Sequence, residues 1–137
     1  MAQKDFENKL CLRTSNKVYN QSLVASLLDT HGEKSTEAII QGWVNNLAKP
    51  VFTSDTLLLK AIERGQCAVG IANSYYWLRL VKEGQAKSVK VFWPNQASRG
   101  VHVNISGAGV VKYSKQPEVA RTFIAVSYTH LTLPTKA

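Results

Sequence analysis

Three tyrosines beside short apolar segments are the side chains best suited to chemistry in this sequence. Tyr75 and Tyr76 close the apolar run 67–74, and Tyr19 lies after a short apolar segment within 13–23. A phenolate is a hard oxygen ligand, and hard trivalent ions such as ferric iron prefer hard oxygen. Neighbouring side chains diverge in regular structure, but at a strand-to-helix turn both can face one cleft. The tyrosines therefore indicate a metal site, with core and rim packing as the plainer interpretation.

Alternating strands and helices would have to position these tyrosines. Apolar spacing and turn residues predict strands at 9–13, 67–72 and 89–93, an extended stretch at 101–112, and helices at 15–31, 35–49, 53–65, 75–82 and 117–124. This alternation predicts an α/β layer structure with a mixed, largely parallel sheet flanked by helices. We expect the tyrosine hydroxyls to converge on one open face at the carboxyl ends of the strands, where α/β sheets place ligands.

The length and composition favour a single domain. A chain of 137 residues with 45% hydrophobic content can bury one core. No run approaches the ~20 apolar residues that a membrane span requires, and the polar residues 1–9 show no secretory signal pattern. There is no Ser/His/Asp arrangement, glycine-rich phosphate loop or convincing carboxylate pair, so we do not expect an enzyme.

The formal net charge of +8 raises the question of nucleic-acid binding. The lysines and arginines are scattered singly, without a basic stripe, zinc-finger spacing or RNA-binding sheet motif. A solvated basic surface is therefore favoured, and a basic nucleic-acid-binding domain is the less favoured alternative. We expect no nucleic-acid partner.

Two cysteines, Cys11 and Cys67, each lie within a short apolar segment. Their wide separation carries no zinc signature. They are either independent buried thiols or one disulfide in an oxidising compartment. If the two segments are neighbouring strands, a Cα separation within ~7 Å makes the disulfide feasible.

Other polar groups have plain interpretations. His31 lies in a helix-ending turn and is expected at the surface, and His102 is expected as a satisfied residue of a strand. The stretch 53–55 is interpreted as a helix N-cap, with an anion-binding helix start as the less favoured alternative.

The last residues need a separate interpretation. Residues 126–135 match, residue for residue, the translation of a transposase adapter used in sequencing libraries. We therefore interpret 126–137 as an artefact without a packed or functional role. The helix that starts at Pro117 is expected to fade near Ala125.

Four segments carry a family resemblance: RTSNKVYNQS (13–22), GQCAVGIANSYY (65–76), VFWPN (91–95) and GVHVNISGAG (100–109). They resemble the ferric-ion-binding periplasmic proteins of bacterial ABC iron importers, in order and spacing, from Phe6 to Ile124. The resemblance implies a type II periplasmic binding protein, whose two lobes close on the ligand like a clamp. It assigns 1–100 to the second lobe and 101–125 to a hinge strand and the start of the return to the first lobe. The first lobe and the carboxyl-terminal helices are expected to be missing.

The resemblance also implies the chemistry. Tyr19, Tyr75 and Tyr76 map onto the iron-ligand tyrosines, so their phenolates would hold Fe(III). Arg79, one helical turn beyond the pair, and Arg13 would be cations beside the ligands. Such proteins work in the periplasm, take further ligands from the first lobe and deliver iron to an ABC importer permease. The alternative is the same fold binding another small anion or solute, with the tyrosines used for stacking.

Overall fold

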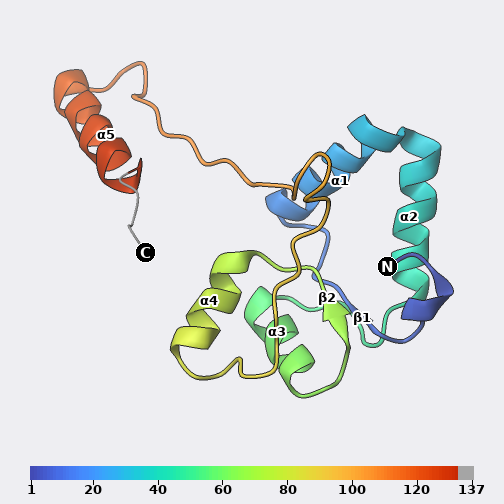
Figure 1. The fold of residues 1–137 in the computed structure, drawn as a ribbon. Helices are drawn as coiled ribbons and strands as arrows, with labels where there is room; N and C mark the ends of the chain where they lie inside the picture. Colours follow the sequence, from blue (N-terminus) through green and yellow to red (C-terminus); the bar gives the residue numbers. More distant parts are fainter. Residues whose placement is uncertain (133–137) are drawn as a thin grey trace. The chain divides into compact units, whose positions relative to one another are not determined.

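The computed structural model describes residues 1–132, with side chains described for residues 1–128, and it divides into two units (Figure 1). The first unit is Met1–Val103, and the second begins at Asn104. In chain order the elements are the 3₁₀ helix η1 (Lys4–Phe6), β1 (Leu10–Cys11), α1 (Val18–His31), α2 (Glu33–Asn45), α3 (Asp55–Glu63), β2 (Val69–Gly70), α4 (Ser74–Lys82) and α5 (Pro117–Thr132). Within the described residues, no helix is both long and apolar enough to cross a membrane.

The small sheet of the first unit is parallel. β1 pairs with β2 so that Leu10 lies opposite Val69. On the other side of β1, the irregular segment 46–52 runs in the same direction, and the Ala48 N–H donates to the Leu10 carbonyl at 2.9 Å. β1 is therefore the central strand, and its neighbour 46–52 is a sheet segment that the sequence patterns did not reveal.

The core of the first unit lies where α3 meets the two strands. Cys11 and Leu58 are fully buried, and Ala61 and Cys67 are nearly so. Leu58 and Ala61 are three residues apart, so they lie on the same face of α3. The buried face of α3 also includes Leu59, whereas Leu57 is 52% exposed.

A disulfide between Cys11 and Cys67 crosses this core, with Cα atoms 5.9 Å apart. The predicted proximity is confirmed, and the alternative of independent buried thiols is set aside. The link closes a loop between residues 56 apart in sequence. In the chain-entropy model, such a loop corresponds to about 4 kcal/mol of stabilisation.

Gly70 is required where β2 approaches α3. A Cβ at this position would lie 2.7 Å from Leu58 Cδ2 and 2.9 Å from the Cys11 carbonyl oxygen. No real Cβ makes such contacts, so the strand can lie this close to the helix only with glycine.

The predicted strand at 89–93 is wrong. The backbone N–H groups of residues 87–89 donate to the Glu63 carboxylate at 3.0–3.2 Å. A side chain thus satisfies groups that a neighbouring strand would otherwise pair with. Phe92, which the alternating pattern placed in the sheet, is 84% exposed.

Several helix boundaries in the first unit differ from the predicted ones; α2, for example, ends at Asn45 and not at residue 49. α1 begins at Val18, two residues after the expected cap at Asn16. The Asn16 side-chain oxygen accepts a hydrogen bond from the Thr14 hydroxyl at 2.8 Å, so it serves the preceding turn instead. Gly32, at φ 74°, ends α1 as predicted, and α2 follows directly at Glu33.

In the second unit, α5 continues to Thr132 and does not fade near Ala125, as the sequence had led us to expect. The intervening residues contain neither glycine nor proline, so no helix breaker precedes Pro134. The Tyr128 side chain on this last stretch is 70% exposed. The remaining part of the artefact interpretation, 133–137, lies outside the described residues.

Candidate metal centre

The three candidate tyrosines follow the two parallel strands. Tyr19 lies in the first turn of α1, after β1, and Tyr75 and Tyr76 lie in the first turn of α4, after β2. Because the carboxyl ends of parallel strands meet at one edge of a sheet, their following segments begin close together. The strand order therefore brings residues far apart in sequence to the same edge.

Tyr75 and Tyr76 form a contacting pair. Their ring centroids are 4.4 Å apart and their planes are tilted by 36°. The hydrogen bond with Tyr76 is the leading cause that raises the pKa of Tyr75, followed by burial and by the charges of Tyr76 and Tyr19, while Arg13 acts in the opposite direction. Tyr75 is 58% exposed. Tyr19 and Arg13 thus lie within electrostatic reach of an accessible phenol.

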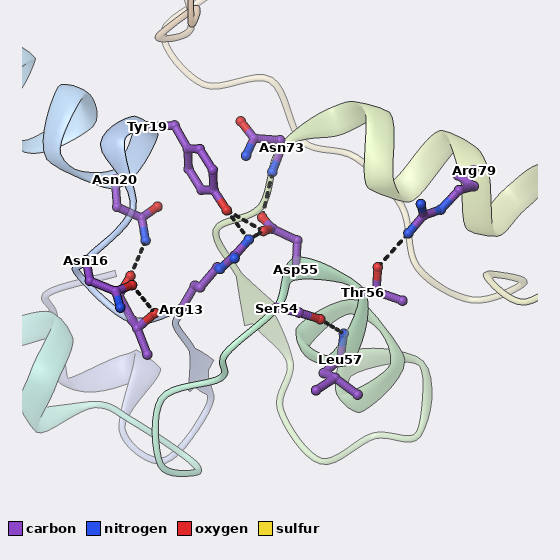
Figure 2. A network of polar contacts seen from close by, with 11 residues as sticks. Arg13, Asn16, Tyr19, Asn20, Ser54, Asp55, Thr56, Leu57, Asn73 and Arg79 are labelled. Carbon is purple, nitrogen blue, oxygen red and sulfur yellow. Dashed lines mark hydrogen bonds and ion pairs between the residues drawn. The ribbon is translucent and has the colours of Figure 1, made fainter.

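Asp55, in the first turn of α3, contacts both Tyr19 and Asn73, the residue immediately before α4 (Figure 2). Its side chain is 1% exposed. Oδ2 accepts a hydrogen bond from the Tyr19 hydroxyl at 2.9 Å and pairs with the Arg13 guanidinium. Oδ1 accepts the backbone N–H of Asn73 at 3.2 Å, immediately before α4. One buried carboxylate therefore contacts both segments that carry candidate ligands.

Arg13 holds Tyr19 from a second direction. Its Nη1 contacts the Tyr19 hydroxyl, and its Cζ lies 5.2 Å from the centroid of the Tyr19 ring. The Arg13 side chain is only 8% exposed. A guanidinium over an aromatic face is attracted by the ring quadrupole. Tyr19 is thus held by both the guanidinium of Arg13 and the carboxylate of Asp55.

Arg79 lies beside the ring of Tyr76. Its Cζ is 5.4 Å from the Tyr76 ring centroid, and its Nη2 donates to the Thr56 hydroxyl at 2.9 Å (Figure 2). The second contact joins α4 to α3. Arg79 therefore places a positive charge near the pair while its guanidinium is tethered to the neighbouring helix.

The chemistry available here is that of oxygen ligands. Among the described residues, no group of three or more His, Cys, Asp or Glu side chains is arranged to hold a metal ion. Three phenolates together balance the formal charge of a trivalent cation, and such a cation stabilises the ionised phenol. Hard oxygen donors suit hard ions. Tyrosine phenolates are thus the kind of oxygen donor that ferric iron prefers.

Sequence reasoning missed Asp55 as a member of this site. The stretch 53–55 was interpreted as an N-cap, and Ser54 does cap α3 by accepting the Leu57 N–H at 3.1 Å. The N-cap interpretation accounted for Ser54 but did not predict that Asp55 contacts Arg13, Tyr19 and Asn73. The available signal was Arg13, which stands within the segment predicted as a short buried strand, because a buried guanidinium requires an acidic partner.

His31 and His102 make contacts outside the tyrosine site. His31 is exposed at the end of α1, with Nε2 3.4 Å from an Arg99 nitrogen, which confirms the surface interpretation. His102 is not in a strand, so that prediction is wrong. Its Nε2 lies 3.1 Å from the Ser22 hydroxyl instead.

Comparison with known proteins gives close relatives among iron-binding proteins, although no family model matches the chain. Iron uptake protein A1 of Synechocystis is 41% identical over 130 residues, which cover 90% of this chain and 36% of that protein. The Fe(3+)-binding periplasmic protein of Serratia marcescens is 30% identical over 106 residues, which cover 76% of this chain and 31% of that protein. The chain thus spans about a third of the length of these curated relatives.

Solved structures agree with these relatives. The Trichodesmium FutA (IdiA) structure, in complex with iron and citrate, superposes with a TM-score of 0.83 at 43% identity, covering 89% of this chain and 40% of that one. The ferric iron-binding protein A of Mannheimia haemolytica, in an open conformation, gives 0.82 at 30% identity, covering 90% and 40%. Over about nine tenths of its length, the chain is therefore homologous to the bacterial ferric-iron-binding proteins and has part of their type II periplasmic binding protein fold.

Proposed function

We propose that this chain binds ferric iron through the phenolate oxygens of Tyr19, Tyr75 and Tyr76. The observation that supports this most strongly is the placement of all three phenols after the two parallel strands, with Tyr19 acting electrostatically on Tyr75. The presence of iron in the matching Trichodesmium FutA structure supports the same ligand.

Charge balance explains why three tyrosines suit a trivalent ion. A free tyrosine hydroxyl loses its proton only near pH ~10. A trivalent cation reverses this preference by stabilising the phenolate, and three phenolates cancel its formal charge. Ferrous iron is less charged and softer, so the same ligands hold it less well. Reduction is therefore one route of release.

We also infer the setting in which the chain acts. It spans about two fifths of the matching structures. In a two-lobed protein of their length, the other lobe would supply further ligands and close over the iron. The closed form would then deliver iron to an ABC importer permease in the periplasm. The disulfide supports an oxidising compartment of this kind.

The test is the colour of the iron complex. Addition of ferric nitrilotriacetate to the full chain is expected to produce a visible tyrosinate-to-iron charge-transfer band. Tyr75→Phe and Tyr76→Phe should each weaken and shift this band. Tyr113→Phe is the matched control, because Tyr113 lies in the second unit and is 85% exposed. A colourless mixture, or a band that survives loss of both paired tyrosines, contradicts the proposal.

The same experiment separates the alternatives. A small organic anion stacked on the tyrosines would change their fluorescence without any visible band. A basic nucleic-acid-binding domain would bind DNA with strong salt dependence and show no colour.

A further inference from the structure

We propose that Asp55 is a positioning residue for the iron site: its carboxylate holds Tyr19 at a fixed place relative to the Tyr75–Tyr76 pair. This inference rests on the proposed function, since it concerns the same site. Asp55 would not bind iron itself. It would act by joining the two segments that carry the phenols before iron arrives. When Tyr19 gives up its proton to the solvent on binding iron, the Arg13 guanidinium, which contacts both oxygens, would keep Asp55 and the phenolate linked.

The geometry of the carboxylate supports this role. Oδ2 takes the Tyr19 hydroxyl at 2.9 Å, and Oδ1 takes the Asn73 N–H at 3.2 Å (Figure 2). Asn73 is the N-cap of α4 and stands two residues before Tyr75. The path from Tyr19 through Asp55 to the start of α4 is therefore only two hydrogen bonds long. The two ends of this path, Tyr19 and Asn73, are more than fifty positions apart in the sequence.

Asp55 is itself anchored. It stands in the first turn of α3, where the helix dipole favours a negative charge. The same helix contributes Leu58 and Ala61 to the disulfide-linked core. Tyr19, the proposed iron ligand, is therefore hydrogen-bonded to a helix that is packed into the core. Preorganised ligands spend less of their binding free energy on ordering when the ion arrives.

Only a carboxylate fits the three donors that surround it. Both oxygens of Asp55 accept hydrogen bonds, from the Arg13 guanidinium, the Tyr19 hydroxyl and the Asn73 N–H. An asparagine in the same place offers one oxygen and one NH₂ group, and that NH₂ would face a donor. A buried donor left without an acceptor destabilises its surroundings. Asp55→Asn is therefore a nearly isosteric change that breaks the link on at least one side.

The first readout needs no iron. In the metal-free full chain, NMR spectra of ring-labelled tyrosine and of backbone amides report on Tyr19 and Asn73. In Asp55→Asn, the chemical shifts and line widths of Tyr19 and Asn73 should move towards those of exposed, mobile residues. Asp29→Asn is the matched control, because Asp29 is an exposed residue on α1. Unchanged Tyr19 and Asn73 signals in Asp55→Asn overturn the proposal.

The second readout is the iron complex. We expect Asp55→Asn to lower the apparent affinity for ferric nitrilotriacetate by about tenfold or more and to shift the charge-transfer band, with no effect from Asp29→Asn. Wild-type affinity in Asp55→Asn overturns the positioning role. If the wild-type chain shows no colour at all, the proposed function fails, while the metal-free spectra still judge the role of Asp55.

A double variant covers the case in which Asp55→Asn unfolds because Arg13 is left as a buried, unpaired cation. Arg13→Gln/Asp55→Asn removes both charges and should fold. Because Arg13 also contacts Tyr19, the double variant is compared with Arg13→Gln alone. If Asp55 positions Tyr19, the double variant displaces the Tyr19 signals and weakens iron binding more than Arg13→Gln does. If it regains wild-type affinity and wild-type Tyr19 signals, Asp55 only neutralises Arg13, and the proposal is overturned.

Discussion

Cys11 and Cys67 join β1 to the residues that lead into β2, with Cα atoms 5.9 Å apart. The two strands that precede the candidate tyrosines are thus connected covalently as well as by backbone hydrogen bonds. The strands that lead to the two tyrosine-bearing helices are consequently held together by a covalent bond.

Removal of this disulfide should lower stability substantially. Cys11→Ser/Cys67→Ser is expected to lose about 2–4 kcal/mol of unfolding free energy, because the cross-link restricts the unfolded chain. Urea denaturation measures the loss. The reduced wild-type chain should have the same urea midpoint as the double variant without reductant. If the wild-type midpoint is the same with and without reductant, the prediction is contradicted.

Gly70→Ala should destabilise the first unit by about 1–3 kcal/mol. The new Cβ would meet Leu58 Cδ2 at 2.7 Å and the Cys11 carbonyl oxygen at 2.9 Å, and the backbone oxygen has little room to move. Gly107→Ala is the control, because a Cβ there has no neighbour within 4 Å. Chemical denaturation of both variants decides the matter, and equal midpoints would show that β2 relaxes more easily than its contacts suggest.

Glu63 should make stability depend on acidity. Burial alone would raise the pKa of Glu63, but hydrogen bonds from the backbone of Ser88, Lys87 and Val89 outweigh it and hold the pKa below its ordinary value. A carboxyl with a lowered folded pKa stabilises the fold above its unfolded pKa, and this contribution disappears as the pH falls through the folded pKa. Thermal melts should therefore show wild-type stability falling below about pH 4.3. Glu63→Gln should reduce this loss of stability at low pH. Glu7→Gln is the control, because Glu7 is exposed, and it should leave the pH dependence unchanged.

Tyr76→Phe should make Tyr75 ionise at lower pH. The hydrogen bond with Tyr76 is the leading cause that raises the pKa of Tyr75, so its removal lets the pKa fall towards the ordinary value. An ultraviolet titration of phenolate absorbance in the metal-free chain measures this. Tyr113→Phe should remove one titrating group without shifting the others. A Tyr76→Phe curve that differs from wild type only in amplitude would rule out the coupling.

Deletion of residues 126–137 tests our proposal that this stretch is an artefact. The described part of it adds two turns to α5, with Val126 51% and Tyr128 70% exposed. We expect the helical content to fall while the unfolding midpoint of the first unit and the iron colour stay unchanged. Circular dichroism and thermal melts of the truncated chain measure both. A clear loss of stability would mean that the stretch belongs to the fold.

The features that could be predicted from the sequence are those set by local pattern. α3 follows from its apolar spacing and its Ser54 cap, and the proximity of Cys11 to Cys67 follows from two short apolar segments that suit neighbouring strands. The position of the tyrosines after β1 and β2 follows from the alternation of strands and helices, while the convergence of their hydroxyls stays a prediction. Each of these depends on residues close together in the chain or on a general rule of α/β architecture.

The features that were missed depend on partners distant in sequence. The residues 89–93 alternate like a strand, but the Glu63 carboxylate takes the N–H groups that lead into them. Asp55 looks like any helix-start acid until Arg13 and Tyr19 are placed beside it. Nothing in a local pattern distinguishes a carboxylate that caps a turn from one that joins three segments.

The central position of β1 also bears on solubility. Its two edges are both occupied, by β2 on one side and by the irregular segment 46–52 on the other. Exposed strand edges are the usual templates for edge-to-edge aggregation between copies of a protein. The most apolar strand of the sheet, with Leu10 and Cys11 fully buried, is therefore shielded from intermolecular pairing by a stretch of chain that forms no regular strand of its own.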